Sequence, residues 1–172
     1  MSMNLGMSTE ISVIVIVVAC LAIIPVLIAG LAVLSARAQT PKDLGLVENH
    51  FVACPATPNC VSTHSTSPQH GSEPIRFSGS ASEAFARLQT IVKQQPRAQI
   101  ITAANGYLHV EFTSRIFHFV DDAQFLFDEN QGVIHFRSSS RSGYSDLGVN
   151  RRRMESLRTA FENADPTIDS CS

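Results

Sequence analysis

The chain has 172 residues, of which 44% are hydrophobic and 16% are charged, and its formal net charge is −2. This length accommodates one domain with an appendage but is too short for two ordinary domains. Acidic residues lie close to the arginines and the net charge is slightly negative, which argues against nucleic acid as a partner. The hydrophobic residues are concentrated near the N-terminus, so the chain divides into parts by composition.

An uncharged apolar run extends from Ile11 to Leu34, after a short N-terminal tail of residues 1–10. It exceeds the about 20 residues that a helix needs to cross a bilayer, and Pro25 and Gly30 are tolerated in such helices. A cleavable signal peptide would have basic residues before a shorter apolar core, and the tail has none. A lipoprotein at Cys20 would turn polar after the cysteine, whereas this chain stays apolar. We therefore expect residues 11–34 to form a single uncleaved transmembrane anchor.

Two features bear on the side of the membrane that the rest of the chain occupies. Arg37 and Lys42 follow the apolar run, and such basic flanks usually stay in the cytoplasm. Cys54 and Cys60 favour the other side, because two prolines between them force a turn that could bring the thiols together. A disulfide there would require an oxidising compartment. Two unrelated buried thiols would have the same spacing, which matches neither a CxxC redox motif nor a zinc motif.

Residues 35–73 contain this cysteine pair and are rich in Pro, Ser and Thr. They show neither helical nor alternating periodicity, so we expect a linker. His64 and His70 lie in it without a neighbouring acidic cluster, and we expect loop histidines in contact with solvent rather than metal ligands. We expect no metal and no cofactor elsewhere in the chain.

The patterns of an α+β domain begin after the linker and extend over residues 74–172. A short strand is expected at IRFSG, and Ser80 and Glu83 then have the spacing of a capping box at a helix start. Apolar residues follow on one face of that helix until Pro96 ends it. A second helix is expected from about Asn150 to Phe161, because its apolar residues recur at helical spacing.

Between these helices, apolar and polar residues alternate as in half-buried strands. Strands are expected at AQIITAA, YLHVEFT, RIFHFVDDAQFLF and GVIHFRS, and Asn105-Gly106 is a typical hairpin turn. The apolar face, which we expect in the core, includes Phe117, Phe119, Phe125 and Phe127. The predicted fold class is α+β, with a single N-terminal transmembrane helix followed by an antiparallel sheet with helices packed on one face.

The opposite face of the predicted sheet is polar. Its candidate functional residues are His109, His118, Asp121, Asp122 and His135. Histidines and carboxylates on one face could bind a ligand or perform acid–base chemistry. The solvent-facing side of a half-buried sheet would have the same composition, so both interpretations remain open.

The stretch FRSSSRSGYSDLGVNRRR, from Phe136 to Arg153, concentrates arginines at a strand end, a loop and a helix start. Arginine at a helix start opposes the helix dipole, so these side chains need negatively charged or polar partners. One interpretation is an anion site formed by Arg137, Ser138, Ser140, Arg141 and Arg151. The other is an internal network that joins the arginines to Asp121, Asp122 and Asp146.

Three blocks carry a family resemblance: Pro-Asn-Cys-Val-Ser, Phe-Val-Asp-Asp, and Arg-Ser-x-Ser-Arg-x-Gly-x-Ser-Asp-x-Gly-x-Asn-Arg. From about Leu46 to the C-terminal helix, the chain resembles the bacterial and plastid family called domain of unknown function 1499. The resemblance implies an envelope or lumenal protein with an N-terminal membrane or targeting segment, and no established activity. It favours the outward orientation. Members of that family often carry Glu where this chain has Gln124, so the polar face has one carboxylate fewer here.

These observations predict a single-pass protein of the cytoplasmic membrane whose domain faces the periplasm. We expect the domain to bind a protein partner or a small anionic ligand without turnover. The alternative is a hydrolase-like enzyme that acts on an anionic substrate through the His/Asp/Arg polar face. The sequence contains no Gly-rich phosphate loop, nucleophile elbow or zinc signature that would support it.

Overall fold

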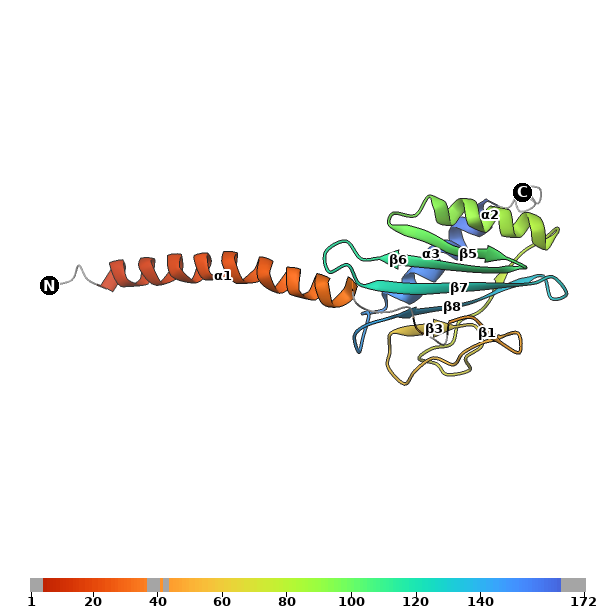
Figure 1. The fold of residues 1–172 in the computed structure, drawn as a ribbon, viewed down its shortest axis with the longest axis horizontal. Helices are drawn as coiled ribbons and strands as arrows, with labels where there is room; N and C mark the ends of the chain where they lie inside the picture. Colours follow the sequence, from red (N-terminus) through yellow and green to blue (C-terminus); the bar gives the residue numbers. More distant parts are fainter. Residues whose placement is uncertain (1–4, 37–40, 42–43, 165–172) are drawn as a thin grey trace.

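The computed structural model describes residues 5–36, 41 and 44–164 (Figure 1). The chain begins with a long helix, α1 (Leu5–Ala36), which extends away from the rest of the molecule. Its segment Ser12–Gly30 has a mean hydropathy of 3.2, and none of these residues is buried. A core helix of a soluble protein would bury much of its surface, whereas Ser12–Gly30 is apolar and has no buried residue. By length and composition it can cross a membrane, as we predicted.

The domain after α1 is built on a six-stranded antiparallel sheet with two helices on one face (Figure 1). Five strands lie in the order β3 (Cys60–Ser62), β8 (Val133–Ser140), β7 (Val120–Asp128), β6 (Tyr107–Thr113) and β5 (Ala98–Ala104). The short strand β4 (Ile75–Arg76) pairs with the beginning of β8. The helices are α2 (Ala81–Lys93) and α3 (Val149–Asn163). The predicted α+β fold class is confirmed.

Local signals in the sequence explain how these elements begin and turn. Ser80 and Glu83 form both hydrogen bonds of a capping box at the start of α2. Asn105 and Gly106 have φ angles of 53° and 72°, as the tight hairpin between β5 and β6 requires. Helix α3 begins after Gly148 without a capping side chain of its own; the carboxylate of Asp146 accepts the N–H groups of Gly148 and Asn150 instead.

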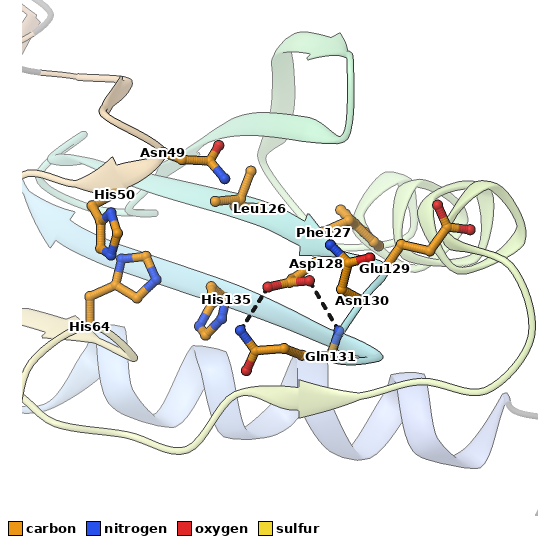
Figure 2. Close-up of a pocket in the computed structure, with 10 residues that line it drawn as sticks. All are labelled: Asn49, His50, His64, Leu126, Phe127, Asp128, Glu129, Asn130, Gln131 and His135. Carbon is orange, nitrogen blue, oxygen red and sulfur yellow. Dashed lines mark hydrogen bonds between the residues drawn. The ribbon is translucent and has the colours of Figure 1, made fainter.

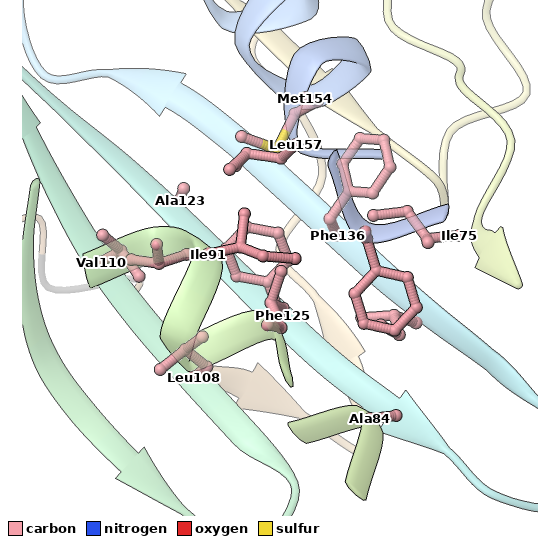
Figure 3. Packing of buried hydrophobic residues seen from close by; sticks show 14 of the residues in the cluster. Ile75, Ala84, Ile91, Leu108, Val110, Ala123, Phe125, Phe136, Met154 and Leu157 are labelled. Atoms are coloured by element: carbon pink, nitrogen blue, oxygen red, sulfur yellow. The ribbon is translucent and has the colours of Figure 1, made fainter. Parts of the chain in front are cut away.

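The core fills the space between the sheet and the two helices (Figure 3). Its largest fully buried side chains include Phe125, Phe136 and Phe161. Phe117 and Phe119, which we expected there, stack on each other in the loop between β6 and β7 instead. The expected strand begins five residues too early, because a turn and the left-handed backbone of His118 (φ 54°) interrupt the alternation before Val120.

Part of the segment that we expected to be a linker is folded onto the sheet. Two short strands, β1 (Leu46–Val47) and β2 (His50–Phe51), form a hairpin, and β3 pairs with the end of β8. Residues 41 and 44–55, the covering segment, lie across the sheet face that the helices leave open; Gly45 donates its N–H to the side-chain oxygen of Gln124 there (2.8 Å). Strands of two or three residues are too short to produce a periodic sequence pattern, which is why the prediction missed them.

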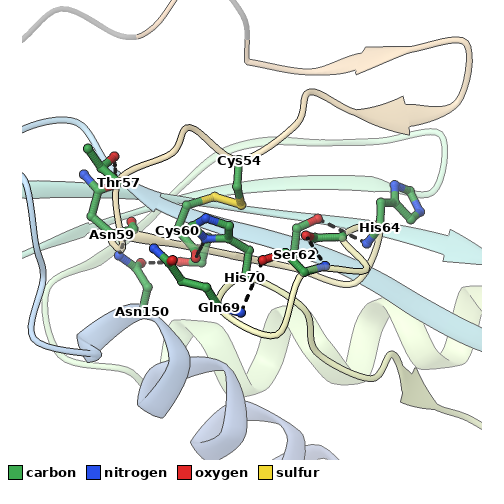
Figure 4. The surroundings of a disulfide bond; sticks show 12 residues. Cys54, Thr57, Asn59, Cys60, Ser62, His64, Gln69, His70 and Asn150 are labelled. Carbon is green, nitrogen blue, oxygen red and sulfur yellow. Dashed lines mark hydrogen bonds between the residues drawn. A yellow bond between two sulfur atoms is a disulfide. The ribbon is translucent and has the colours of Figure 1, made fainter.

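The predicted disulfide is present and joins Cys54 to Cys60 (Figure 4). Cys54 lies in the covering segment and Cys60 begins β3, so the bond ties the covering segment to the edge of the sheet. His70 lies beside this bond and its Nδ1 contacts the carbonyl oxygen of Cys60 (3.0 Å). His70 is buried, contrary to the solvent-exposed loop histidine that we expected.

Replacing Cys54 with alanine should lower the free energy of unfolding by about 2–3 kcal/mol, because so short a loop restricts the unfolded chain only modestly. Urea unfolding of the full chain in detergent, followed by pulse proteolysis, measures the difference. Ala53→Ser, which changes the exposed neighbour and keeps the bond, is the control. Peptide mapping of protein purified from membranes checks the bond itself, and two free thiols there would refute the pairing.

Candidate functional site

Four charged or ionisable side chains meet on the covered face of the sheet and form what we call the charge cluster. His109 and Glu111 lie on β6, Asp122 on β7, and Arg141 directly after β8. Alternation along β6 places His109 and Glu111 on the same face, and the strand register sets Glu111 opposite Asp122. Arg141 is held beside them because its backbone N–H donates to the carbonyl oxygen of Val120 (3.0 Å).

Arg141 is the centre of the cluster. Its Nε and Nη2 donate to the two carboxylate oxygens of Asp122, both at 2.7 Å, in a bidentate pair. The same Nη2 donates to the carboxylate of Glu111. His109 Nε2 lies 2.8 Å from Asp122 Oδ1, so both oxygens of Asp122 have partners. Each charged group of the cluster therefore has a partner within the cluster.

The electrostatics of the cluster favour the ionised forms of Asp122 and Arg141. Burial alone would raise the pKa of Asp122, but hydrogen bonds from Arg141 and His109 outweigh it and lower that pKa below its ordinary value. The hydrogen bond to Asp122 raises the pKa of Arg141. A lowered carboxyl pKa means that this stabilisation is present above the ordinary pKa of aspartate and is lost as the pH falls through the lowered value.

The covering segment, rather than solvent, lies over this face. Asp122 is 1% exposed and His109 is 5% exposed. The interpretation of this face as the solvent-facing side of a half-buried sheet therefore does not hold for these residues. Gln124 connects the two layers, because its side-chain oxygen accepts hydrogen bonds from Tyr107 Oη (2.9 Å) and from the N–H of Gly45 (2.8 Å). Burial, with a contribution from the Asp122 charge, raises the pKa of Tyr107 to about 12, so its hydroxyl stays protonated.

Asp121 lies on the other face of the sheet, against the helices, and not on the polar face where we placed it. Adjacent residues of a strand point to opposite faces, so Asp121 and Asp122 cannot share one. Arg153 donates to Asp121 Oδ2 (2.7 Å), and the hydroxyl of Ser140 donates to the other oxygen. Arg153 also lies 4.5 Å from the ring centre of Phe112. This second charged pair joins α3 to β7.

The five residues of the predicted anion site do not converge. Arg137, Ser140 and Arg141 line a pocket of about 210 Å³ beneath Pro41 and Leu44 of the covering segment. Ser138 lies on the helix face, where its hydroxyl donates to Asn150. Arg151 donates to the backbone carbonyl oxygens of Gly71 (2.9 Å) and Gln69 (2.9 Å). Only Arg137 and Arg141 are thus left to this small pocket. Ser140 also lines it, but its hydroxyl donates to Asp121 on the helix face, and Ser138 and Arg151 have other partners.

The histidines that we predicted on the polar face do not lie together either. His118 is exposed in the loop between β6 and β7. His135 lies on β8, and β7 separates that strand from His109 on β6. It lines a different pocket, of about 390 Å³, together with His50, His64 and residues of the turn between β7 and β8 (Figure 2). We call this the histidine pocket.

His64, expected to be a loop histidine in contact with solvent, packs between His50 and His135 with ring centres 4.9 and 4.5 Å away. Burial, followed by the proximity of His135 and His50, lowers the pKa of His64 to about 4. The ring is therefore neutral at pH 7. The sequence did not indicate this cluster, because its members come from three segments that only the folded chain brings together.

Three residues of the charge cluster are of the types that bind metal ions. Ligand atoms of His109, Glu111 and Asp122 lie within 4.8 Å of one another, a spacing that could hold an ion. However, the guanidinium of Arg141 already contacts both carboxylates. A metal ion would have to displace this cation, so the residues fit an internal ion-pair network better than a metal site.

Arg141 should therefore be the residue of the arginine-rich stretch most sensitive to substitution. Arg141→Ala leaves buried Asp122 without its main partner and should cost about 3 kcal/mol or more. Arg141→Lys keeps the charge but loses the bidentate geometry, so it should resemble the alanine variant. Thermal melts of the full chain in detergent, with and without phosphate, measure both. Arg152→Ala is the matched control, because Arg152 is exposed and its side chain contacts a backbone carbonyl oxygen.

Phosphate should stabilise the wild type and the Arg141 variants to the same small extent. If Arg141→Ala instead melts like the wild type without phosphate, and loses a stabilisation that phosphate gives the wild type, Arg141 belongs to an anion site.

Comparison with known proteins places the chain in a family. A comparison with curated proteins and one with solved structures found no match. Among protein families, the one described as "Protein of unknown function (DUF1499)" matches residues 50–161. These residues include both disulfide-bonded cysteines, the charge cluster, helix α2 and all but the last two residues of α3. The chain therefore belongs to the DUF1499 family of proteins of unknown function.

Proposed function

We propose that this protein is a membrane-anchored interaction domain of the cell envelope, held on the periplasmic side of the cytoplasmic membrane, and that it acts by binding rather than by turnover. The observation that carries the proposal is the mutual pairing of the charged groups on the covered face. Arg141, Asp122, Glu111 and His109 contact one another beneath the covering segment.

This pairing argues against the hydrolase-like alternative. A general acid or base must come within hydrogen-bond reach of the substrate, directly or through one water molecule. His109 and Asp122 are the cluster's best candidates for that role, yet both are buried and Asp122 has partners on both oxygens. Their arrangement supports a role in holding β6, β7 and the end of β8 together under the covering segment.

The location rests on two independent observations. Helix α1 has the length and composition of a membrane span, and its exposed apolar surface needs a lipid environment to be covered. The disulfide between Cys54 and Cys60 persists only in an oxidising compartment, which favours the periplasmic side over the cytoplasm. Arg37 and Lys42 alone are too few to reverse this orientation.

Reporter fusions at the C-terminus test this location without interrupting the domain, since α3 ends at Asn163. We expect a phosphatase that is active only after export to be active, and removal of residues 1–36 to abolish that activity. A phosphatase that stays inactive while a cytoplasm-only fluorescent reporter is bright would contradict the orientation. Loss of the N-terminal helix from the mature protein would contradict the anchor.

A further inference from the structure

Two loops leave the sheet at the same end and carry exposed apolar side chains at their tips. The loop of residues 114–119 joins β6 to β7, and the loop of residues 141–148 joins β8 to α3. The register sets Thr113 opposite Val120 and Asp121 opposite Ser140, so the two loops emerge side by side. Figure 1 shows both at the end of the sheet nearest α1.

The apolar side chains on these loops are unusually exposed. Leu147 is 83% exposed, Tyr144 74% and Ile116 56%. Phe117 is also exposed and stacks on Phe119 in the same loop. Single exposed apolar residues are common, but several on two adjacent loops indicate a surface that contacts an apolar partner. We call these two loops the apolar tips.

The chain itself holds the apolar tips close to the anchor. Pro41 and Leu44 line a pocket together with Ser140 and Arg141, at the strand end from which the second loop leaves. Helix α1 ends at Ala36. Pro41 follows Ala36 by five positions, so even a fully extended chain places the two at most about 18 Å apart. If α1 spans a bilayer, this end of the sheet must lie near its surface.

Exposed arginines lie around the apolar tips, and acidic residues lie in the turns at the other end of the sheet, although exposed Arg76 also lies at that other end. Arg97, Arg115 and Arg152 are exposed around the apolar tips, and the Asp146 carboxylate in the second loop caps α3. At the other end of the sheet, the turns carry acidic residues, Glu48 beside the histidine pocket and Asp128 and Glu129 in its lining. Exposed arginines around apolar side chains suit the headgroup region of a membrane that contains anionic lipids.

We propose that the apolar tips insert into the interfacial region of the bilayer that α1 crosses, with Arg97, Arg115 and Arg152 against anionic headgroups. The inference rests on the membrane-anchored domain proposed above. Docking would fix the orientation of the domain on the membrane. It would also direct the histidine pocket, whose lining includes the turn at the other end of β7, away from the lipid and toward soluble partners.

The absence of tryptophan from the sequence allows a direct test. Single tryptophans are introduced as Leu147→Trp and, independently, Ile116→Trp in the full chain. Asn130→Trp, in the exposed turn between β7 and β8, is the matched control. Each variant is reconstituted into vesicles of phosphatidylethanolamine and phosphatidylglycerol, with and without lipids brominated on their acyl chains. Flotation of the vesicles reports in the same samples whether the chain is anchored.

We expect brominated lipid to quench the tryptophans at 147 and 116 by about half or more and to leave the tryptophan at 130 nearly unchanged, because interfacial groups lie within about 5–10 Å of the acyl boundary. Replacing phosphatidylglycerol with phosphatidylcholine should weaken the quenching. If the protein floats with the vesicles but brominated lipid quenches the tryptophans at 147 and 130 equally, the docking is wrong and the anchor is still supported. A chain that does not float would overturn both proposals.

Discussion

The bidentate pair between Arg141 and Asp122 is the interaction on which the covered side of this domain depends. An ionised carboxylate with 1% exposure is strongly destabilising unless opposite charge and hydrogen bonds compensate it. Here Arg141 supplies both the opposite charge and the hydrogen bonds. Glu111 accepts a further hydrogen bond from Arg141, and His109 contacts Asp122. The covering segment can then close over a polar face, and the disulfide between Cys54 and Cys60 holds that segment at the edge of the sheet.

The need of buried carboxylates for a cationic partner also explains why so many arginines occur in one stretch of the chain. Asp121 and Asp122 are adjacent on β7 and point to opposite faces, and each receives a guanidinium from its own side: Arg153 of α3 on the helix face and Arg141 on the covered face. Arg151 and Arg152 donate to backbone carbonyl oxygens. The arginines at the start of α3 are thus tolerated against the helix dipole because each is matched to an acceptor.

Much of the fold could be predicted from the sequence, because its signals are local. The capping box at Ser80 and the Asn105-Gly106 turn each specify a backbone conformation by themselves. The site could be predicted only in part. Alternation from buried Phe125 assigns Asp121 to the helix face and Asp122 to the other face, but it does not show which arginine reaches each of them. The histidine pocket and the covering segment depend on contacts between distant segments, which no local pattern records.

A double-mutant cycle between Arg141 and Asp122 tests the central claim, that this pair acts as an internal unit of the fold. Arg141→Gln, Asp122→Asn and the double variant are compared with the wild type by urea unfolding at pH 7, in detergent and without added anions. Arg141→Gln leaves buried Asp122 without its cation and should cost about 3 kcal/mol or more, whereas Asp122→Asn leaves Arg141 paired with Glu111 and should cost less. The double variant should cost less than the sum of the two, with a coupling energy of about 2 kcal/mol. Additive effects with coupling below about 0.5 kcal/mol would contradict the account.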